Sequence, residues 1–170
     1  DIPNSVAGGV RSAAACRPLF LTLHASGGKA MMRAAVDAAA DSGAVRPALL
    51  GITVLTSLDD SDLDAVGQRG PLGDQAERLA LLAREAGLDG VVCSPHEIAR
   101  LRLACGPGFK LVVPGIRPAW AEAGDQKRVM TPAEAVTLGA DHLVIGRPIT
   151  HAADPKAALG RILAVFDAAA

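Results

Sequence analysis

Residues 85–94, EAGLDGVVCS, and residues 137–146, TLGADHLVIG, share one pattern that decides the fold. Each begins in a helix-forming stretch, passes through a glycine (Gly87 or Gly139) and continues as a short apolar run. Glycine readily adopts the left-handed conformation with which many helices end. The pattern therefore predicts the end of a helix, a tight turn and a buried strand, and the chain uses it twice.

Five apolar runs are the strand candidates of the chain. Their apolar residues are nearly continuous rather than alternating, which is typical of parallel strands that are covered on both faces. The opening residues 1–6, DIPNSV, are expected to be the end of a further strand and the loop after it. The five runs span residues 19–25, 48–56, 90–94, 110–116 and 142–146.

The segments between these runs carry the signals of helix starts. In SPHE and TPAE, a hydroxyl residue can cap the first turn, proline follows where no N–H donor is needed, and glutamate stands three residues after the cap. Aspartate takes the capping position in DQAE and DPKA. The expected caps are Asp74, Ser94, Thr131 and Asp154, and helices are expected to stop near Gly43, Gly87, Gly106 and Gly139.

Strict alternation of strands with helices predicts a parallel α/β fold, either an open doubly wound sheet or a TIM barrel. A complete (β/α)8 barrel needs ~250 residues, so five units and a leading helix need roughly 160–170. The chain has 170 residues. We therefore expect a single domain over residues 1–170 that forms the C-terminal two-thirds of a TIM barrel, about its last five strand–helix units, with the first strands missing.

Composition limits the classes of partner. Half of the residues are apolar and the net charge is -1, which gives no electrostatic reason to expect a nucleic acid or a membrane surface. No apolar run approaches the ~20 residues of a membrane span. The three widely spaced cysteines, Cys16, Cys93 and Cys105, are typical of free thiols in a reducing compartment. We expect a cytoplasmic protein.

Two arginines follow the last two strand candidates at corresponding places. Arg117 comes two residues after the glycine of PGIRP, and Arg147 comes directly after Gly146 in IGRPIT. The ends of the last strands of a TIM barrel commonly bind phosphate, and two guanidinium groups can hold it with forked, charge-assisted hydrogen bonds. The alternative is that both arginines form surface ion pairs.

The segment between these strands, residues 119–132, is long and polar for a barrel loop, as is typical of lids that close over a ligand. Gln126 could then donate to the substrate, whereas in a merely solvated loop Lys127 and Arg128 would point into water. Thr56, at the end of the second run, places a hydroxyl at the barrel mouth. No His or Cys spacing resembles a metal site, so no metal is expected.

Taken together, the motifs of the chain resemble orotidine 5'-phosphate decarboxylase of the bacterial type from residue 1 to about residue 166. The resemblance implies a TIM barrel that converts orotidine 5'-phosphate to UMP in pyrimidine nucleotide synthesis, without a cofactor or metal. It also implies a homodimer with the active sites at its interface. The motifs are DIPNSV (1–6), HASGG (24–28), TVLTS (53–57), LDGVVCS (88–94), PGIRP with GDQKRVMTP (114–118 and 124–132) and VIGRPIT (144–150).

The same resemblance assigns roles to residues. Asp1 corresponds to the last aspartate of the family signature D-x-K-x-x-D-I-P-N-T and is the expected catalytic residue. Ser5 stands where the signature ends in threonine, and by the likeness both residues serve the site of the neighbouring subunit. Thr56 matches a pyrimidine contact. The expected substrate-binding residues are Ile2, Ser5, Thr56, Arg117, Gln126, Gly146 and Arg147.

The lysine of the signature, which protonates the product carbanion, would precede Asp1. We therefore expect the catalytic lysine to lie N-terminal to this chain, and the chain alone to be inactive. The alternative is a catalytically inactive barrel fragment that binds a phosphorylated ligand or a partner fragment.

Overall fold

The computed structural model describes residues 1–43, 46–121 and 128–167. Its centre is a five-stranded sheet in the order β1-β2-β3-β4-β5, and every neighbouring pair is parallel. All five predicted strands are present, and each is shorter than its apolar run, because the last residues of the run leave the ladder for the following loop. The strands are β1 (Phe20–His24), β2 (Ala48–Ile52), β3 (Gly90–Val92), β4 (Lys110–Val113) and β5 (His142–Leu143).

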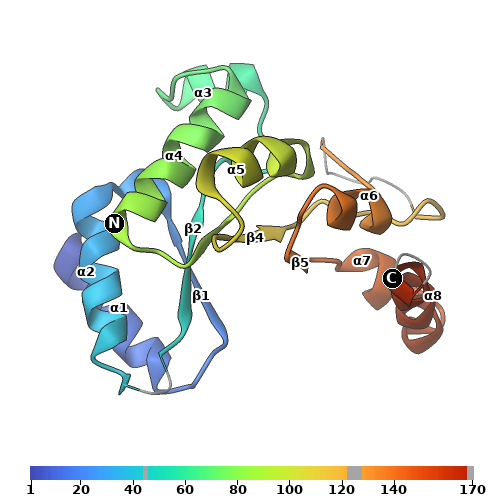
Figure 1. The fold of residues 1–170 in the computed structure, drawn as a ribbon, viewed down its shortest axis with the longest axis horizontal. Helices are drawn as coiled ribbons and strands as arrows, with labels where there is room; N and C mark the ends of the chain where they lie inside the picture. Colours follow the sequence, from blue (N-terminus) through green and yellow to red (C-terminus); the bar gives the residue numbers. More distant parts are fainter. Residues whose placement is uncertain (44–45, 122–127, 168–170) are drawn as a thin grey trace.

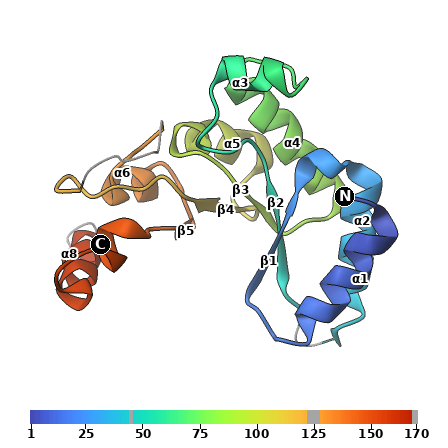
Figure 2. The same ribbon diagram turned by 180° about the vertical axis from the view of Figure 1, so that it is seen from behind.

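At least one helix lies between every two consecutive strands, and the helices surround the sheet on its outer side (Figures 1 and 2). Within the described residues, no helix is long and apolar enough to cross a membrane. The helices are α1 (Pro3–Ala14), η1 (Ala25–Gly27), α2 (Lys29–Ala40), α3 (Asp60–Ala65), α4 (Leu72–Ala86), η3 (Pro95–Glu97), α5 (Ile98–Cys105), α6 (Pro132–Thr137), α7 (Arg147–Thr150) and α8 (Pro155–Asp167).

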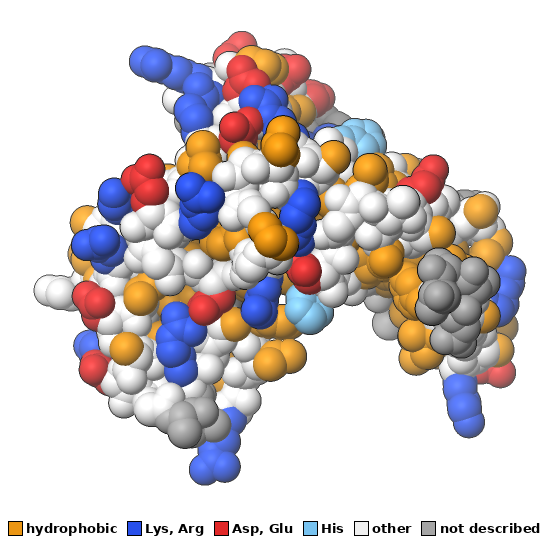
Figure 3. Space-filling model, viewed as in Figure 1, with side chains coloured by type: hydrophobic (Ala, Val, Ile, Leu, Met, Phe, Trp, Pro, Cys, Tyr) orange, Lys and Arg blue, Asp and Glu red, His pale blue; other side chains and the backbone are white. Residues whose placement is uncertain are grey.

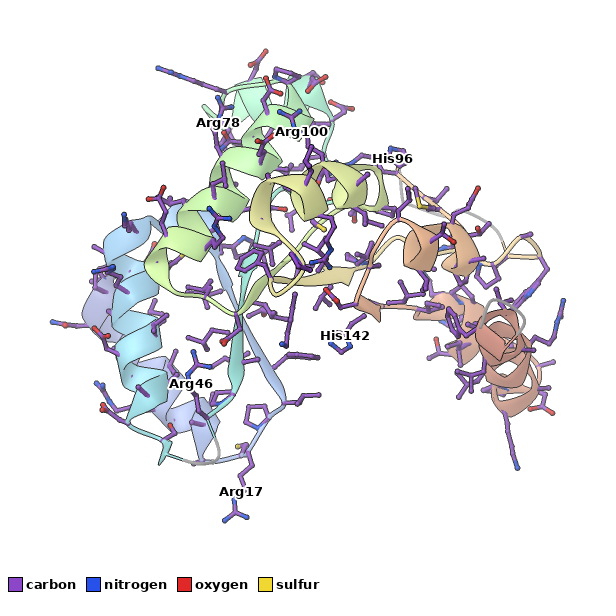
Figure 4. All side chains as sticks on the ribbon, in the orientation of Figure 1. Arg17, Arg46, Arg78, His96, Arg100 and His142 are labelled. Carbon is purple, nitrogen blue, oxygen red and sulfur yellow. The ribbon has the colours of Figure 1, made fainter. Side chains whose placement is uncertain are left out.

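The sheet is strongly curved. Phe20 in β1 and His142 in β5 belong to the two edge strands, yet their rings pack edge to face with centroids 4.8 Å apart. Figure 4 shows His142 on the concave side of the sheet, and Figure 3 shows the hollow that this side forms between the part with α1 and α2 and the part with α8. Curvature that brings side chains of opposite strands together is the geometry of a barrel wall.

Three of the four predicted caps are confirmed. Ser94 and Thr131 each form a complete capping box with the glutamate three residues later, and the Asp154 carboxylate accepts from the Ala157 N–H at 2.9 Å. The prediction for Asp74 is wrong, because α4 begins two residues earlier at Leu72. The Leu72 N–H donates instead to the Asp60 carboxylate at 2.7 Å, so the first-turn donor is satisfied from α3.

Two helical segments differ from the expectation. The residues expected as a loop before α1 are largely helical: α1 begins at Pro3, whose fixed φ suits a first helical position, and the Val6 N–H donates to Ile2 O at 3.0 Å. The short helix α3 was not predicted. Its start is a capping box formed by Asp59 and Asp62, in which aspartate replaces the more usual glutamate.

The repeated pattern ends its helices as predicted and then adds a contact between strands. Gly87 and Gly139 have φ angles of 92° and 103°. The aspartate two residues after each glycine accepts a backbone N–H from the preceding strand: Asp89 from Leu49 and Asp141 from Leu111, both at 2.7 Å. Both aspartates therefore fix the N-terminal ends of neighbouring strands relative to each other.

The core lies between the sheet and the outer helices and consists mainly of aliphatic side chains. Cys93 and Cys105 are buried and Cys16 is exposed, and all three are free thiols. Burial raises the pKa of the Cys93 thiol, so it stays protonated and packs as a small apolar side chain. The largest fully buried residues include Met32, Leu49, Leu50, Leu63, Ile98, Leu101, Leu111 and Ile116.

Candidate functional site

Arg117 and Arg147 lie beside one pocket of about 330 Å³ at the C-terminal end of the sheet. Arg117 belongs to the loop that follows β4, and Arg147 is the first residue of α7, which follows β5. The structure therefore brings together two residues that are 30 positions apart and that the sequence placed on adjacent strand ends. The pocket is also lined by Trp120, Ala121, Pro148, His151 and Ala152.

The backbone holds Arg117 firmly in place. Its N–H donates to Met130 O at 2.9 Å, and Ile116 and Met130 form an isolated parallel bridge. The guanidinium is buried, with 8% of the residue exposed, and Nη1 donates to Ile116 O at 3.1 Å. A guanidinium that is fixed before a ligand arrives loses little conformational entropy on binding.

Arg147 differs from Arg117 in exposure. It is exposed to solvent at the start of the short helix α7, and Gly146 is the residue before that helix. A Cβ added to Gly146 would meet no atom within 4 Å. The backbone at this point is therefore open to the approach of a ligand.

Two residues of the pocket were not found from the sequence. Trp120 contributes an indole ring over which Arg161 of α8 lies, with the guanidinium carbon 4.4 Å from the ring centroid. His151 lines the same pocket from the residue after α7. Trp120 lies in the segment predicted to be a lid, residues 119–132, but was not singled out there, and the signal for His151 was its proximity in sequence to Arg147.

Arg128 is buried rather than solvated, which corrects the expectation for a merely solvated loop. Only 9% of the residue is exposed, and its guanidinium forms an ion pair with Glu97, which is 3% exposed. Nη2 also donates to Leu55 O at 3.1 Å. Burial raises the pKa of the Glu97 carboxyl, and the neighbouring Arg128 charge opposes that rise.

Asp1 lies beside a different and larger pocket, of about 680 Å³. This pocket runs along β1 and includes His24 at its end, together with residues of α1. Ile2 and Ser5 are exposed at the start of α1. The structure does not place Asp1 in the pocket that Arg117 and Arg147 share.

Two predicted substrate-binding residues remain, Thr56 and Gln126. Thr56 lies in the turn after β2 and is partly exposed. Gln126 lies outside the described residues. In the part of the chain that is described, no group of three or more His, Cys, Asp or Glu side chains could hold a metal ion.

A comparison with known protein families matches this chain to one of them. A family model described as "Orotidine 5'-phosphate decarboxylase / HUMPS family" matches residues 1–162. The chain belongs to this family. The match covers both pockets and the five strands, and it confirms the resemblance seen in the motifs.

Individual relatives support the same family membership. A protein of Paramagnetospirillum magneticum named orotidine 5'-phosphate decarboxylase is 57% identical, over 96% of this chain and 72% of the relative. A relative of the same name from Sodalis glossinidius is 55% identical, over 96% of this chain and 65% of its own length. The chain thus spans 65–72% of the length of these relatives.

Solved structures support the fold. The crystal structure of orotidine 5'-phosphate decarboxylase from Lactobacillus acidophilus superposes with a TM-score of 0.84 at 40% identity, over 98% of this chain and 71% of the other. An uncharacterized conserved protein from Geobacillus kaustophilus gives a TM-score of 0.82 at 35% identity, over 98% and 72%. The predicted α/β fold of the TIM-barrel type is confirmed, with this chain as a partial length of it.

Proposed function

We propose that the protein decarboxylates orotidine 5'-phosphate to UMP, and that residues 1–170 supply the phosphate-binding part of the active site. One observation carries the proposal: Arg117 and Arg147 lie beside the same pocket at the C-terminal ends of adjacent strands. This is the end of a parallel barrel at which substrates bind. Family membership supplies the substrate class.

The two arginines serve the reaction from a distance. The phosphate group takes no part in the breaking bond, so its binding energy can be used to position the pyrimidine for reaction. Buried Arg117 supplies a fixed charge and exposed Arg147 a second one, and together they form charge-assisted hydrogen bonds to the phosphate. Gln126 and the open backbone at Gly146 complete this phosphate site, and Thr56 contacts the pyrimidine.

The chemical step needs a proton donor beside the ring carbon. Loss of carbon dioxide leaves an electron pair on that carbon, and a positioned ammonium group both stabilises the developing charge and donates the proton. By family likeness a lysine of the signature, which precedes Asp1 in the motif, supplies the ammonium. The Asp1 carboxylate keeps that lysine charged and oriented.

We further propose a cytoplasmic homodimer. Asp1, Ile2 and Ser5 are exposed at one end of the chain, beside a different pocket from the one that contains the arginines. By family likeness, Asp1 and Ser5 serve the active site of a second subunit. No cofactor or metal takes part in the proposed reaction.

The test is UMP binding, measured by titration calorimetry with Arg147→Ala. We expect the affinity for UMP to fall at least about thirtyfold, or about 2 kcal/mol, because a charged partner of the phosphate is lost. Arg33→Ala, which removes an exposed arginine of α2, is the matched control and should bind UMP like the wild type. Equal affinities for Arg147→Ala and the wild type would overturn the proposal.

A turnover assay on the protein with the N-terminal segment that carries the signature lysine separates the decarboxylase from the second candidate, an inactive fragment that binds a phosphorylated ligand or a partner fragment. The observation that favours this candidate is that the arginine pocket and the Asp1 pocket are separate in the chain. Loss of orotate absorbance on addition of orotidine 5'-phosphate would identify the enzyme. UMP binding that depends on Arg147, without such a loss, would identify the inactive fragment.

A further inference from the structure

Glu97 and Arg128 form a buried ion pair between the turn after β3 and the segment that leads into α6. Glu97 ends η3, the turn that follows β3, and its other carboxylate oxygen accepts from the Ser94 N–H at 2.9 Å. Arg128 begins the described segment that leads into α6. The Arg128 side chain is 11% exposed and the Glu97 side chain 3%, and Arg128 Nε has no hydrogen-bond partner among the described residues.

The pair connects the loops that follow three consecutive strands. From η3, after β3, Glu97 binds Arg128; from there Arg128 Nη2 reaches Leu55 O in the loop after β2. Beyond Arg128, Met130 O accepts from the Arg117 N–H in the loop after β4. One guanidinium therefore links the residue before Thr56 with the segment that fixes the Arg117 backbone.

A second contact holds the same segment in the same place. His96 Nε2 lies 3.3 Å from Val129 O, within hydrogen-bonding distance. Figure 4 shows His96 on the side of η3 and α5 that faces the segment leading into α6. The segment from Arg128 to Met130 is thus attached at both of its first two residues to the turn after β3.

Stability alone does not explain such a pair. Removing two charges from water is costly, and replacing a buried ion pair by apolar side chains of similar volume is often neutral or stabilising. The pair instead determines position, because a forked guanidinium that donates to two acceptors holds the two acceptors at a fixed place relative to each other. Its acceptors here belong to two different loops of the candidate site.

We infer that Glu97 and Arg128 are positioning residues for the phosphate site: they hold the Arg117 backbone and the turn containing Thr56 in the arrangement that binds the nucleotide. The inference rests on the proposed function, since UMP is the ligand used to detect it. Neither residue lines the arginine pocket. Misplacement of binding groups by about 1 Å is enough to lower activity by a hundredfold.

The decisive variant is the double substitution Glu97→Gln with Arg128→Met. Glutamine keeps an acceptor for the Ser94 N–H, methionine fills much of the volume, and no buried charge remains without a partner. We expect the double variant to melt close to the wild type and to bind UMP about tenfold or more weakly. A purely structural pair predicts the opposite: once stability is preserved, affinity is preserved as well.

Arg128→Lys provides a second and milder test. Lysine keeps the buried charge opposite Glu97, but it lacks the forked guanidinium that also donates to Leu55 O. We expect it to fold and to show weakened UMP binding. Arg100→Met is the matched control, since Arg100 pairs with Asp74 and Glu77 on the outer helices and away from the pocket. Wild-type affinity in both Arg128→Lys and the double variant would overturn the inference.

The outcome for Arg147→Ala separates this inference from the proposed function. If UMP does not bind, or binds without dependence on Arg147, then the proposed function fails. If binding depends on Arg147 but not on Arg128, then only the positioning role fails. In a preparation that turns over substrate, a positioning role should also lower kcat/KM by raising KM, while the melting temperature stays close to that of the wild type.

Discussion

The two ends of the sheet use the same residue type for different purposes. At the N-terminal end, Arg102 donates to the carbonyls of Gly106, Phe109 and Gly139 and pairs with Asp141 at 2.6 Å. At the C-terminal end, Arg117 and Arg147 line a pocket. An arginine surrounded by backbone acceptors holds strands together, whereas arginines that face a pocket can bind a ligand.

This difference follows from the chemistry of parallel strands. Their C-terminal ends lead into the loops that shape a pocket, while their N-terminal ends receive tight turns from helices. Asp89 and Asp141, which lie in those turns, accept hydrogen bonds from the neighbouring strands. Each also pairs with an arginine: Asp89 with Arg46 and Asp141 with Arg102. Substitutions at the N-terminal end should therefore affect stability, and those at the C-terminal end should affect binding.

The largest effect is expected at Gly90, in the first copy of the repeated pattern. A Cβ there would lie 2.3 Å from Lys110 O and 2.9 Å from Lys110 C, both atoms of the β4 backbone. Gly90→Ala should therefore force β3 and β4 apart and lower the free energy of unfolding by about 3 kcal/mol or more, measured by urea unfolding.

Gly8→Ala is the matched control for this substitution. Gly8 lies within α1, and a Cβ there would meet no atom within 4 Å. Alanine should raise the stability by about 0.5–1 kcal/mol, because it has a higher helix propensity and a less flexible unfolded chain. Equal stabilities for Gly90→Ala and the wild type would show that the sheet does not need close strand approach at this end.

The second prediction tests whether the two ends of the sheet act independently. Arg102→Met should lower the free energy of unfolding by about 2 kcal/mol, because three carbonyls and a carboxylate lose a charged donor. UMP affinity, measured in the folded protein, should remain that of the wild type. Arg147→Ala should show the reverse pattern, with a native melting temperature and weak binding.

A crossed result would contradict this assignment. If Arg102→Met weakened UMP binding in fully folded protein, the two ends of the sheet would be coupled rather than separate. If Arg147→Ala lowered the melting temperature as much as Arg102→Met, Arg147 would be a structural residue. Thermal unfolding and calorimetry on the same two preparations distinguish these cases.

The features predicted correctly from the sequence are those set by short-range rules. The caps at Ser94 and Thr131 depend on a residue three positions away, and each strand depends on its own apolar run. The prediction for Asp74 failed because the start of α4 is capped by Asp60, which is 12 residues away. Local patterns cannot indicate such a partner.

The candidate site shows the same limit. Arg117 and Arg147 were predictable because strand ends of a parallel fold gather at one edge. The burial of Arg128 was not, since its partner Glu97 is 31 residues away and had already been explained as part of a capping box. Similarly, the contact of Arg161 with Trp120 arises only when α8 packs against the loop after β4.

The smallest effect is expected away from both ends of the sheet, where Lys29 of α2 pairs with Glu85 of α4 at 2.9 Å. The hydrogen bond and charge of Lys29 lower the pKa of Glu85 below its usual value of 4.5. The folded state therefore binds the Glu85 proton less readily than the unfolded state does. As a result, the pair stabilises the fold above pH 4.5. This stabilisation is lost as the pH falls through the lowered pKa of Glu85. Glu85→Gln should melt slightly below the wild type at pH 7. The gap should narrow as the pH falls below 4.5, and also in 1 M salt, which screens exposed charges. A gap that stays constant with pH would mean that Glu85 stabilises the contact between α2 and α4 through packing rather than charge.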